Sequence, residues 1–202
     1  MTTLAIEIDP DQASGQIPDV PILHNGSGMP LHLTLLYPFT TDGVPGPDEL
    51  ATVRDTLARF TPIDFQLVGT GSFLSARQRV LYLVPDPAAP FVAMIDELSS
   101  ATGRKPYGGA FRDVVPHVTV AVGAPNRVSW QSPGLPRWYG NALTERRIGR
   151  LRERLEVLLP IRARACHADL WVRVEGRWER SRCRPFAFEA RPLAKRDDND
   201  PG

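Results

Sequence analysis

Two histidines in the sequence are each followed, two positions later, by a threonine. The first pair is His32 and Thr34 in PLHLTLLYPF, and the second is His117 and Thr119 in PHVTVAVG. The chain has 4 histidines and 12 threonines. Two such pairs arise by chance with a probability of about 2%, before their similar surroundings are counted. The repetition favours a common function over two unrelated structural histidines.

Both pairs lie in runs that alternate like strands, and this alternation suggests what they do. Alternate residues of a strand point the same way, roughly 7 Å apart, so each imidazole shares a face with a hydroxyl. An imidazole has an ordinary pKa near 6.5, so near neutral pH one can accept a proton while another donates one. Threonine hydroxyls can donate hydrogen bonds to the non-bridging oxygens of a phosphate while it is being transferred. Two such strands side by side would therefore suit phosphodiester chemistry.

A metal site is the alternative interpretation of paired histidines. No carboxylate or cysteine cluster accompanies them, and threonine is a poor ligand for the metals that histidine prefers. The two cysteines, Cys166 and Cys183, lack metal-ligand spacing and are too few for a disulfide framework. We therefore expect reduced thiols, no metal and no cofactor. His24 and His167 lack the threonine and are expected to be structural or surface histidines.

The elements that position the two pairs form an alternation of strands and helices, which is typical of an α+β or α/β fold. Strands are predicted over 2–8, around His32, over 63–74 and 79–85, around His117, and over 161–175 with a turn at Gly176. Helices are predicted after the N-cap Asp48, over 90–102 up to Gly103, and over 142–159. We expect loops over 9–30 and 124–141, one domain over 1–193, and a disordered tail over 194–202.

The net charge of +1 conceals an uneven distribution along the chain. Residues 1–101 carry 4 basic and 12 acidic side chains (4 − 12 = −8), and residues 102–202 carry 20 and 11 (20 − 11 = +9). A basic second half suits a polyanion such as RNA. The chain has 22 arginines and 2 lysines, so a coding bias toward arginine explains the excess of basic residues equally well. The sequence shows neither a membrane-spanning segment nor a signal peptide, so we expect a cytoplasmic protein.

The paired tetrapeptides HLTL (32–35) and HVTV (117–120) resemble the signatures of the 2H phosphoesterase superfamily. The similarity is greatest to its bacterial branch of 2'-5' RNA ligases, or RNA 2',3'-cyclic phosphodiesterases (LigT-like). GMPLHLTLLYPF, LYLVPDPAAPF, PYGGAFRDVVPHVTVA and a tryptophan-bearing hairpin before PFAF are typical of that branch. The resemblance covers most of residues 1–190. It implies an α+β fold of two pseudo-symmetric lobes, each an antiparallel sheet with outer helices, around a central cleft.

The resemblance also implies an activity and the roles of four residues. The reaction would be the metal-independent opening of 2',3'-cyclic phosphates at RNA ends, or the reverse 2'-5' ligation. His117 would activate water and His32 would protonate the departing ribose oxygen, with the roles exchanged in the reverse direction. Thr34 and Thr119 would hold the phosphate. Nothing in the chain resembles a nucleotide-activating loop, so ATP is not expected, and a cleft within one chain requires no protein partner.

Three further residues, Tyr107, Gly108 and Phe111, lie in the loop that enters the second strand. Backbone amides or base stacking would bring this loop to the substrate, with ordinary packing as the alternative for the two rings. Tyr37 shares the parity of Leu33, which predicts a position away from the cleft.

Two rival functions stay open. One is the same chemistry on a small or cyclic nucleotide signal, and the other is a nucleotide- or RNA-binding module without turnover.

Overall fold

The computed structural model describes residues 1–8, 29–75, 78–111, 113–124 and 142–190. The strands are β1 (Thr2–Glu7), β2 (His32–Leu36), β3 (Ile63–Leu74), β4 (Arg79–Asp86), β5 (Val118–Gly123), β6 (Ile161–Ala165), β7 (His167–Val174), β8 (Arg177–Arg180) and β9 (Phe186–Ala187). The helices are α1 (Pro47–Leu57), α2 (Ala89–Thr102), the 3-10 helix η1 (Pro106–Gly109) and α3 (Glu145–Glu156). His24, nearly all of the loops predicted over 9–30 and 124–141, and the predicted tail lie outside the described residues.

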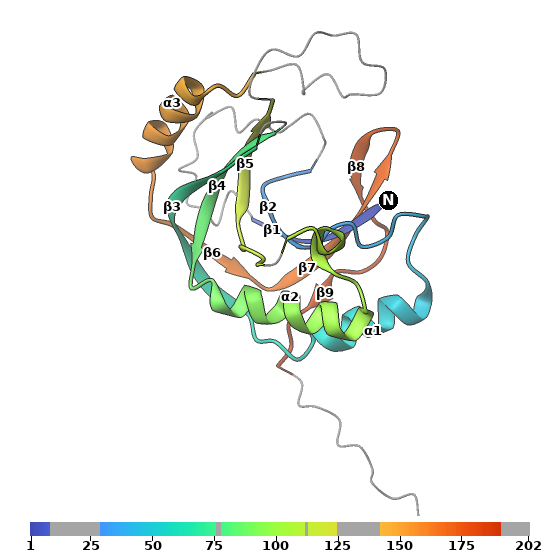
Figure 1. The fold of residues 1–202 in the computed structure, drawn as a ribbon. Helices are drawn as coiled ribbons and strands as arrows, with labels where there is room; N and C mark the ends of the chain where they lie inside the picture. The colour runs from blue at the N-terminus through green and yellow to red at the C-terminus, as the bar shows by residue number, and fades with distance from the viewer. Residues whose placement is uncertain (9–28, 76–77, 112, 125–141, 191–202) are drawn as a thin grey trace, which may run out of the picture.

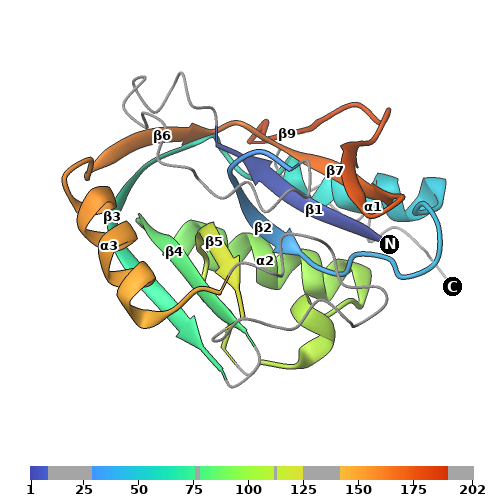
Figure 2. The same ribbon diagram turned by 90° about the horizontal axis from the view of Figure 1, so that it is seen from above.

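The strands form one antiparallel sheet in the order β6-β3-β4-β5-β2-β1-β7-β8, with β9 added beside β7. Figures 1 and 2 show that the sheet is strongly curled, that α1 and α2 lie against one of its faces, and that α3 lies outside β3. The order is symmetrical about the β5–β2 contact, with four strands on each side. The predicted α+β architecture with two pseudo-symmetric halves is therefore confirmed, and the two halves are joined through β2 and β5 into one sheet.

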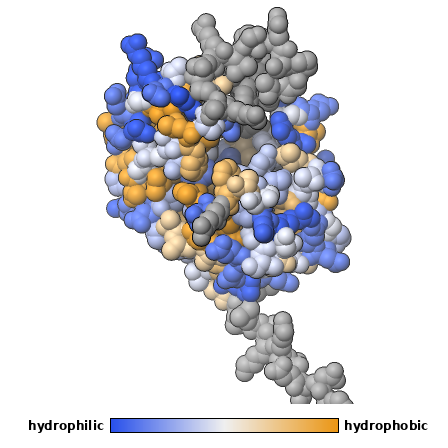
Figure 3. Space-filling model, in the orientation of Figure 1, coloured by the Kyte–Doolittle hydropathy of each residue, from blue (hydrophilic) through white to orange (hydrophobic). Residues whose placement is uncertain are grey.

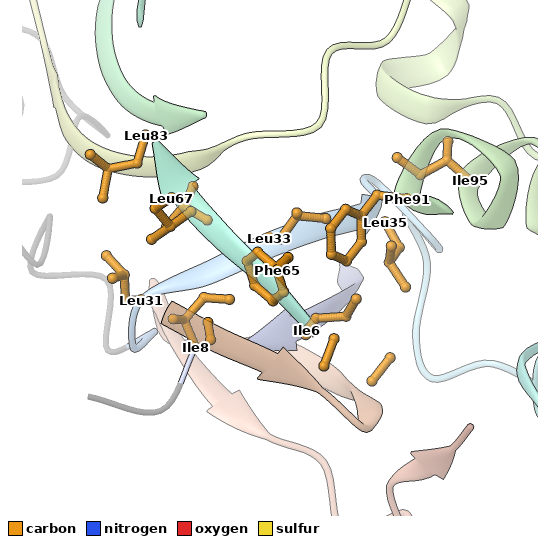
Figure 4. Close-up of a cluster of buried hydrophobic side chains, with 14 of the residues drawn as sticks. Ile6, Ile8, Leu31, Leu33, Leu35, Phe65, Leu67, Leu83, Phe91 and Ile95 are labelled. Carbon is orange, nitrogen blue, oxygen red and sulfur yellow. The ribbon is translucent and has the colours of Figure 1, made fainter. Parts of the chain in front are cut away.

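The hydrophobic core fills the space between the sheet and its helices, as Figure 4 shows. Leu33 and Leu35 of β2 and Phe65 of β3 point into it, and the Phe65 ring meets the edge of Phe91 at 5.0 Å between centroids. Phe91, Met94, Ile95 and Leu98, the apolar stripe of α2, are all buried. Full burial of such a side chain is worth about 1.5–3 kcal/mol. This burial fixes which face of β2 turns inward, and so leaves His32 and Thr34 on the opposite, open face of the sheet.

The ends of several elements differ from the sequence expectation. Helix α1 begins at Pro47 with Gly46 as its N-cap, so the prediction that Asp48 caps it is wrong. Proline suits the first helical position because its φ is preset and it needs no N–H partner. Helix α2 does end at Gly103, whose φ of +68° is the left-handed conformation that glycine favours.

The predicted strand 161–175 is divided into β6 and β7 at Cys166. The buried residues Ile161, Ala163 and Ala165 are followed by Ala168 and Leu170, so the alternation changes phase there. The turn predicted at Gly176 is present, with φ +84°.

Among the described helices none is long and apolar enough to cross a membrane. Figure 3 shows hydrophobic residues interspersed among hydrophilic ones on the visible face.

Candidate active site

The two histidine–threonine pairs meet at the junction between the halves of the sheet. Leu33 of β2 pairs with Val118 of β5, and both side chains are fully buried. Continuing this antiparallel register by one residue in each direction places His32 opposite Thr119, and Thr34 opposite His117. All four side chains are half-buried, because alternation turns them to the open face of the sheet. The structure thus brings the four predicted residues together in a nearly two-fold arrangement.

Both imidazoles are held in the same way by the backbone that precedes them. Nδ1 of His32 lies 2.8 Å from the carbonyl oxygen of Pro30, and Nδ1 of His117 lies 2.7 Å from that of Val115. A carbonyl oxygen only accepts, so each Nδ1 carries the hydrogen and donates it. Each Nε2 then carries a lone pair in the neutral ring and donates a hydrogen in the protonated ring. Either histidine is therefore equipped to act as a base or as an acid.

The environment of the histidines shifts their proton affinity downward. Burial lowers the pKa of His32 below its ordinary value of 6.5, the Pro30 carbonyl opposes this shift, and the charge of His117 lowers that pKa further. Burial likewise lowers the pKa of His117, opposed by the Val115 carbonyl. Since protonation of one ring disfavours protonation of the other, the two titrate as a pair through a singly protonated state. That state holds one acid and one base.

The hydroxyls of Thr34 and Thr119 complete the polar group at the junction. Neither has a hydrogen-bond partner among the residues the structure describes, although both side chains are half-buried. An unpaired hydroxyl beside an imidazole is ready to donate to an anionic oxygen. Two donors and two imidazoles together suit a phosphate group whose non-bridging oxygens carry charge during transfer.

Aromatic rings flank His117 on the β3–β4 side. Phe73 stacks on Tyr82 with centroids 4.4 Å apart, and each of these rings lies 5.1 Å from the imidazole of His117. Tyr82 pairs with Thr119 across β4 and β5, which turns its side chain to the open face. Sequence reasoning did not single out either ring. Their position beside His117 depends on the order of the strands, which a single sequence does not reveal.

Charged side chains flank His32 on the opposite side. Glu7 of β1 is paired with His32 in the register and forms an ion pair with Arg180. Nε2 of His167 lies 3.5 Å from Oδ2 of the buried Asp169. Burial raises the pKa of Asp169, and the charge of His167 opposes this rise. His167 was expected to be structural or at the surface, and it lies half-buried in this charged group.

The charged group on the His32 side was missed in the sequence, although one signal for it exists. His167, Asp169 and Trp171 stand at a period of two in the strand segment HADLWVRV. That period places them on one face, but it does not say which strands lie beside them. Arg180 completes the group by covering the buried Trp171 ring, with its guanidinium carbon 5.3 Å from the ring centroid.

The loop residues lie at the end of β2. The N–H of Tyr107 donates to the carbonyl oxygen of Tyr37 at 2.5 Å, and their rings meet edge to face at 6.0 Å. Phe111 is 61% exposed and touches only the edge of Tyr107 among the rings of the described chain. Gly108 has φ +64° in η1. In the described part of the chain, neither a hydrogen bond nor a ring contact joins these three residues to His32 or His117.

Tyr37 lies where its sequence parity did not predict. The β1–β2 register shifts between Leu4 and Ala5, which are paired with Leu36 and Thr34, so Leu35 is an extra residue and the alternation reverses. The Tyr37 ring lies 6.2 Å from Trp178, which packs on the open face with Ala5 and Trp171. The prediction that Tyr37 points away from the cleft face is therefore wrong.

In the described ranges, no group of three or more histidine, cysteine or acidic residues is placed to hold a metal ion.

Comparison with known proteins shows the family and the fold of the chain. The family model of the 2'-5' RNA ligase superfamily matches residues 23–177. The crystal structure of E. coli LigT in apo form has a TM-score of 0.54 at 18% identity, covering 93% of this chain and 96% of that chain. E. coli LigT complexed with 3'-AMP gives 0.52 at 18% identity, covering 93% and 97%. TT0787 of Thermus thermophilus gives 0.55 at 17% identity, also covering 93% and 97%.

The two kinds of comparison establish different things. At these identities the structural likeness shows a shared fold. A search of curated protein sequences finds no match. The family match spans both histidine–threonine pairs and most of the chain. The chain belongs to the 2'-5' RNA ligase superfamily of 2H phosphoesterases.

Proposed function

We propose that this protein is an enzyme that opens 2',3'-cyclic phosphates at RNA ends by general acid and base catalysis at His32 and His117, without a metal ion. The observation that carries the proposal is the matched pair of imidazoles. Both are fixed with Nδ1–H donating to a backbone carbonyl, on neighbouring strands, and each lies opposite a threonine hydroxyl that has no partner among the described residues. Membership of the superfamily supports phosphodiester chemistry at this site.

The reaction requires one proton to be removed and one to be supplied. Nε2 of neutral His117 takes a proton from water as the water oxygen attacks phosphorus. Protonated His32 gives its Nε2 proton to the ribose oxygen as the bond from that oxygen to phosphorus breaks. Thr34 and Thr119 donate to the non-bridging oxygens, where charge gathers. Afterwards His117 is protonated and His32 is neutral, and exchange with solvent restores the starting state.

The same site joins two RNA ends when the 5'-hydroxyl of a second RNA replaces water. His117 then takes the proton of that hydroxyl as its oxygen attacks the phosphorus of the cyclic phosphate, and His32 protonates the departing ribose oxygen. In the opposite direction His32 is the base toward the ribose hydroxyl and His117 protonates the departing 5'-oxygen, so that the cyclic phosphate forms again. The singly protonated pair serves both directions, because each ring donates from Nδ1 to a backbone carbonyl and presents Nε2 to the substrate. Both histidines come from one chain, so the proposed active site requires no second chain.

Two other functions use the same residues differently. A small or cyclic nucleotide signal would undergo the same chemistry, and the 3'-AMP complex of LigT shows that a fold of this kind takes a single nucleotide. A binding module would hold the nucleotide without turnover. An extended RNA contact loses affinity steeply as salt rises, whereas a mononucleotide site loses little, so salt dependence separates an RNA substrate from a small nucleotide.

The test is hydrolysis of a 2',3'-cyclic mononucleotide and of an RNA oligonucleotide ending in a cyclic phosphate, both in EDTA. We expect turnover of both by the wild type, with kcat/KM for the oligonucleotide falling more steeply with salt. His32→Ala and His117→Ala should each lose about 10²-fold or more of kcat. His167→Ala is the matched control, since it removes a half-buried histidine from the same face and should keep kcat within about threefold. Binding of both ligands without turnover by the wild type contradicts the proposal.

A further inference from the structure

The two sides of the histidine pair are chemically unlike. On the side of β1, β7 and β8, the neighbour of His32 is Glu7, which forms an ion pair with Arg180, so this surface is charged. On the side of β3 and β4, the rings of Phe73 and Tyr82 lie beside His117. A nearly two-fold centre between unlike flanks gives an asymmetric substrate one preferred orientation.

The aromatic flank is not explained by packing of the core. Neither Phe73 nor Tyr82 belongs to the two hydrophobic clusters of the described chain. Phe73 is 39% exposed although one of its faces is stacked on Tyr82, with an interplanar angle of 29°. An apolar ring kept partly in water beside a polar site points to a ligand that covers it.

A glycine builds this flank. Gly71 of β3 is paired with Tyr82 of β4, and a Cβ at Gly71 would lie 2.4 Å from two carbons of the Tyr82 ring. The ring therefore lies flat across β3 only because position 71 has no side chain. Phe73, two residues along the same face of β3, then stacks on the ring. Gly71 thus leaves the room that the Tyr82 ring occupies, and Phe73 stacks on that ring beside His117.

We propose that Phe73 and Tyr82 form the nucleobase subsite of this active site. The substrate then lies with its phosphate between the two histidines and its base on the β3–β4 side of His117. One ribose separates the base of a nucleotide from its 3'-phosphate, and the Phe73 ring is 5.1 Å from the imidazole of His117. Stacking accepts any base, because every base has a π-face. The subsite therefore selects nucleotides over base-free phosphates and discriminates weakly among bases.

The opposite flank offers no comparable platform. Its Trp171 is 5% exposed and is covered by the Arg180 guanidinium. Tyr37 and Trp178 meet edge to face, so their rings form no shared flat surface. The charge of Arg180 is paired with Glu7. These contacts leave Phe73 as the partly exposed, stacked ring beside the pair in the described structure.

The inference rests on the proposed function for where the phosphate lies, and its test is equilibrium binding, which needs no turnover. NMR titration would measure Kd for adenosine 3'-monophosphate and for the base-free glycerol 2-phosphate. Phe73→Ala should raise Kd for the nucleotide about 10-fold, since stacking on one aromatic ring is worth about 1–3 kcal/mol. It should leave Kd for glycerol 2-phosphate within about twofold. Phe73→Tyr should retain nucleotide binding, and Leu74→Ala, which removes the exposed apolar neighbour of Phe73 on β3, should change neither value.

Each other outcome overturns the subsite. Equal weakening of both ligands by Phe73→Ala would mean that the ring only positions His117. No change for the nucleotide would place the base on another surface, such as that of Trp178. A wild type that does not bind the nucleotide has no such subsite. Failure of the proposed reaction is distinct, because base-dependent binding without hydrolysis of the cyclic nucleotide removes the reaction and leaves the subsite.

Discussion

Removal of either threonine hydroxyl at the strand junction should reduce catalysis while sparing the fold. Thr34 and Thr119 are half-buried and have no hydrogen-bond partner among the described residues, so alanine breaks no internal bond. Each hydroxyl is proposed to donate once to the phosphate in the transition state. Loss of one such donor costs kcat about 10²–10³-fold, and we expect the lower value because these side chains are partly exposed to water.

The two threonines should be equivalent and nearly independent. Each lies opposite the other strand's histidine in the register set by Leu33 and Val118, so each would reach a different oxygen of the phosphate. Thr34→Ala and Thr119→Ala should therefore each lower kcat by about 10²-fold, and the double variant by about 10⁴-fold. The free energy of unfolding should fall by no more than about 1 kcal/mol per substitution, the span of strand preferences.

The assay is steady-state hydrolysis of a 2',3'-cyclic mononucleotide, with urea unfolding of each variant as the control for stability. Serine at either position keeps the hydroxyl and should retain kcat within about 10-fold. An alanine variant within threefold of the wild type would refute the reasoning. So would a serine variant that loses as much as alanine, because the methyl group and not the hydroxyl would then be responsible.

Three further predictions follow from the same structure. The pH profile of kcat/KM should be bell-shaped with its maximum below about pH 6.5. Burial lowers the pKa of both histidines below 6.5, so the histidine that acts as the acid is already losing its proton at that pH. A decline that starts only above pH 7.5 would contradict this. Gly71→Ala should displace the Tyr82 ring and raise KM for a cyclic nucleotide about 10-fold, whereas Gly149→Ala, with open space at its Cβ, should not. Leu33→Ala, at a fully buried position in the β2–β5 junction, should lower the unfolding free energy in urea by about 2–5 kcal/mol; a loss under 1 kcal/mol would show that the junction is not held by core packing.

The strands that carry the site could be predicted because their alternation is local. The run from Leu31 to Leu35 shows a period of two, and the structure buries Leu33 and turns His32 to the open face. The apolar stripe and terminal glycine of α2 are equally local, and the structure confirms them. Such signals need only neighbouring residues, so one sequence is enough to read them.

Features that depend on pairing between distant strands were not predictable in this way. The extra residue at Leu35 reverses the parity of Tyr37, and only the register with β1 shows it. Glu7 lies beside His32, and Tyr82 beside Thr119, because β1 and β4 pair with the two central strands. A sequence periodicity gives the face of a strand but not its neighbours. Both flanks of the candidate site were therefore missed, although the four residues that the sequence singled out do lie together at the β2–β5 junction.

The central claim is that His32 and His117 act as one unit, and a double-variant cycle in EDTA tests it most directly. With a 2',3'-cyclic mononucleotide, each single alanine variant should lose about 10²-fold or more of kcat, and the double variant should lose little beyond the worse single variant. Proton removal and proton supply occur in the same displacement, so losing either disables both. Independent, multiplying losses, or a single variant that keeps a tenth of wild-type kcat, would contradict the two-histidine mechanism.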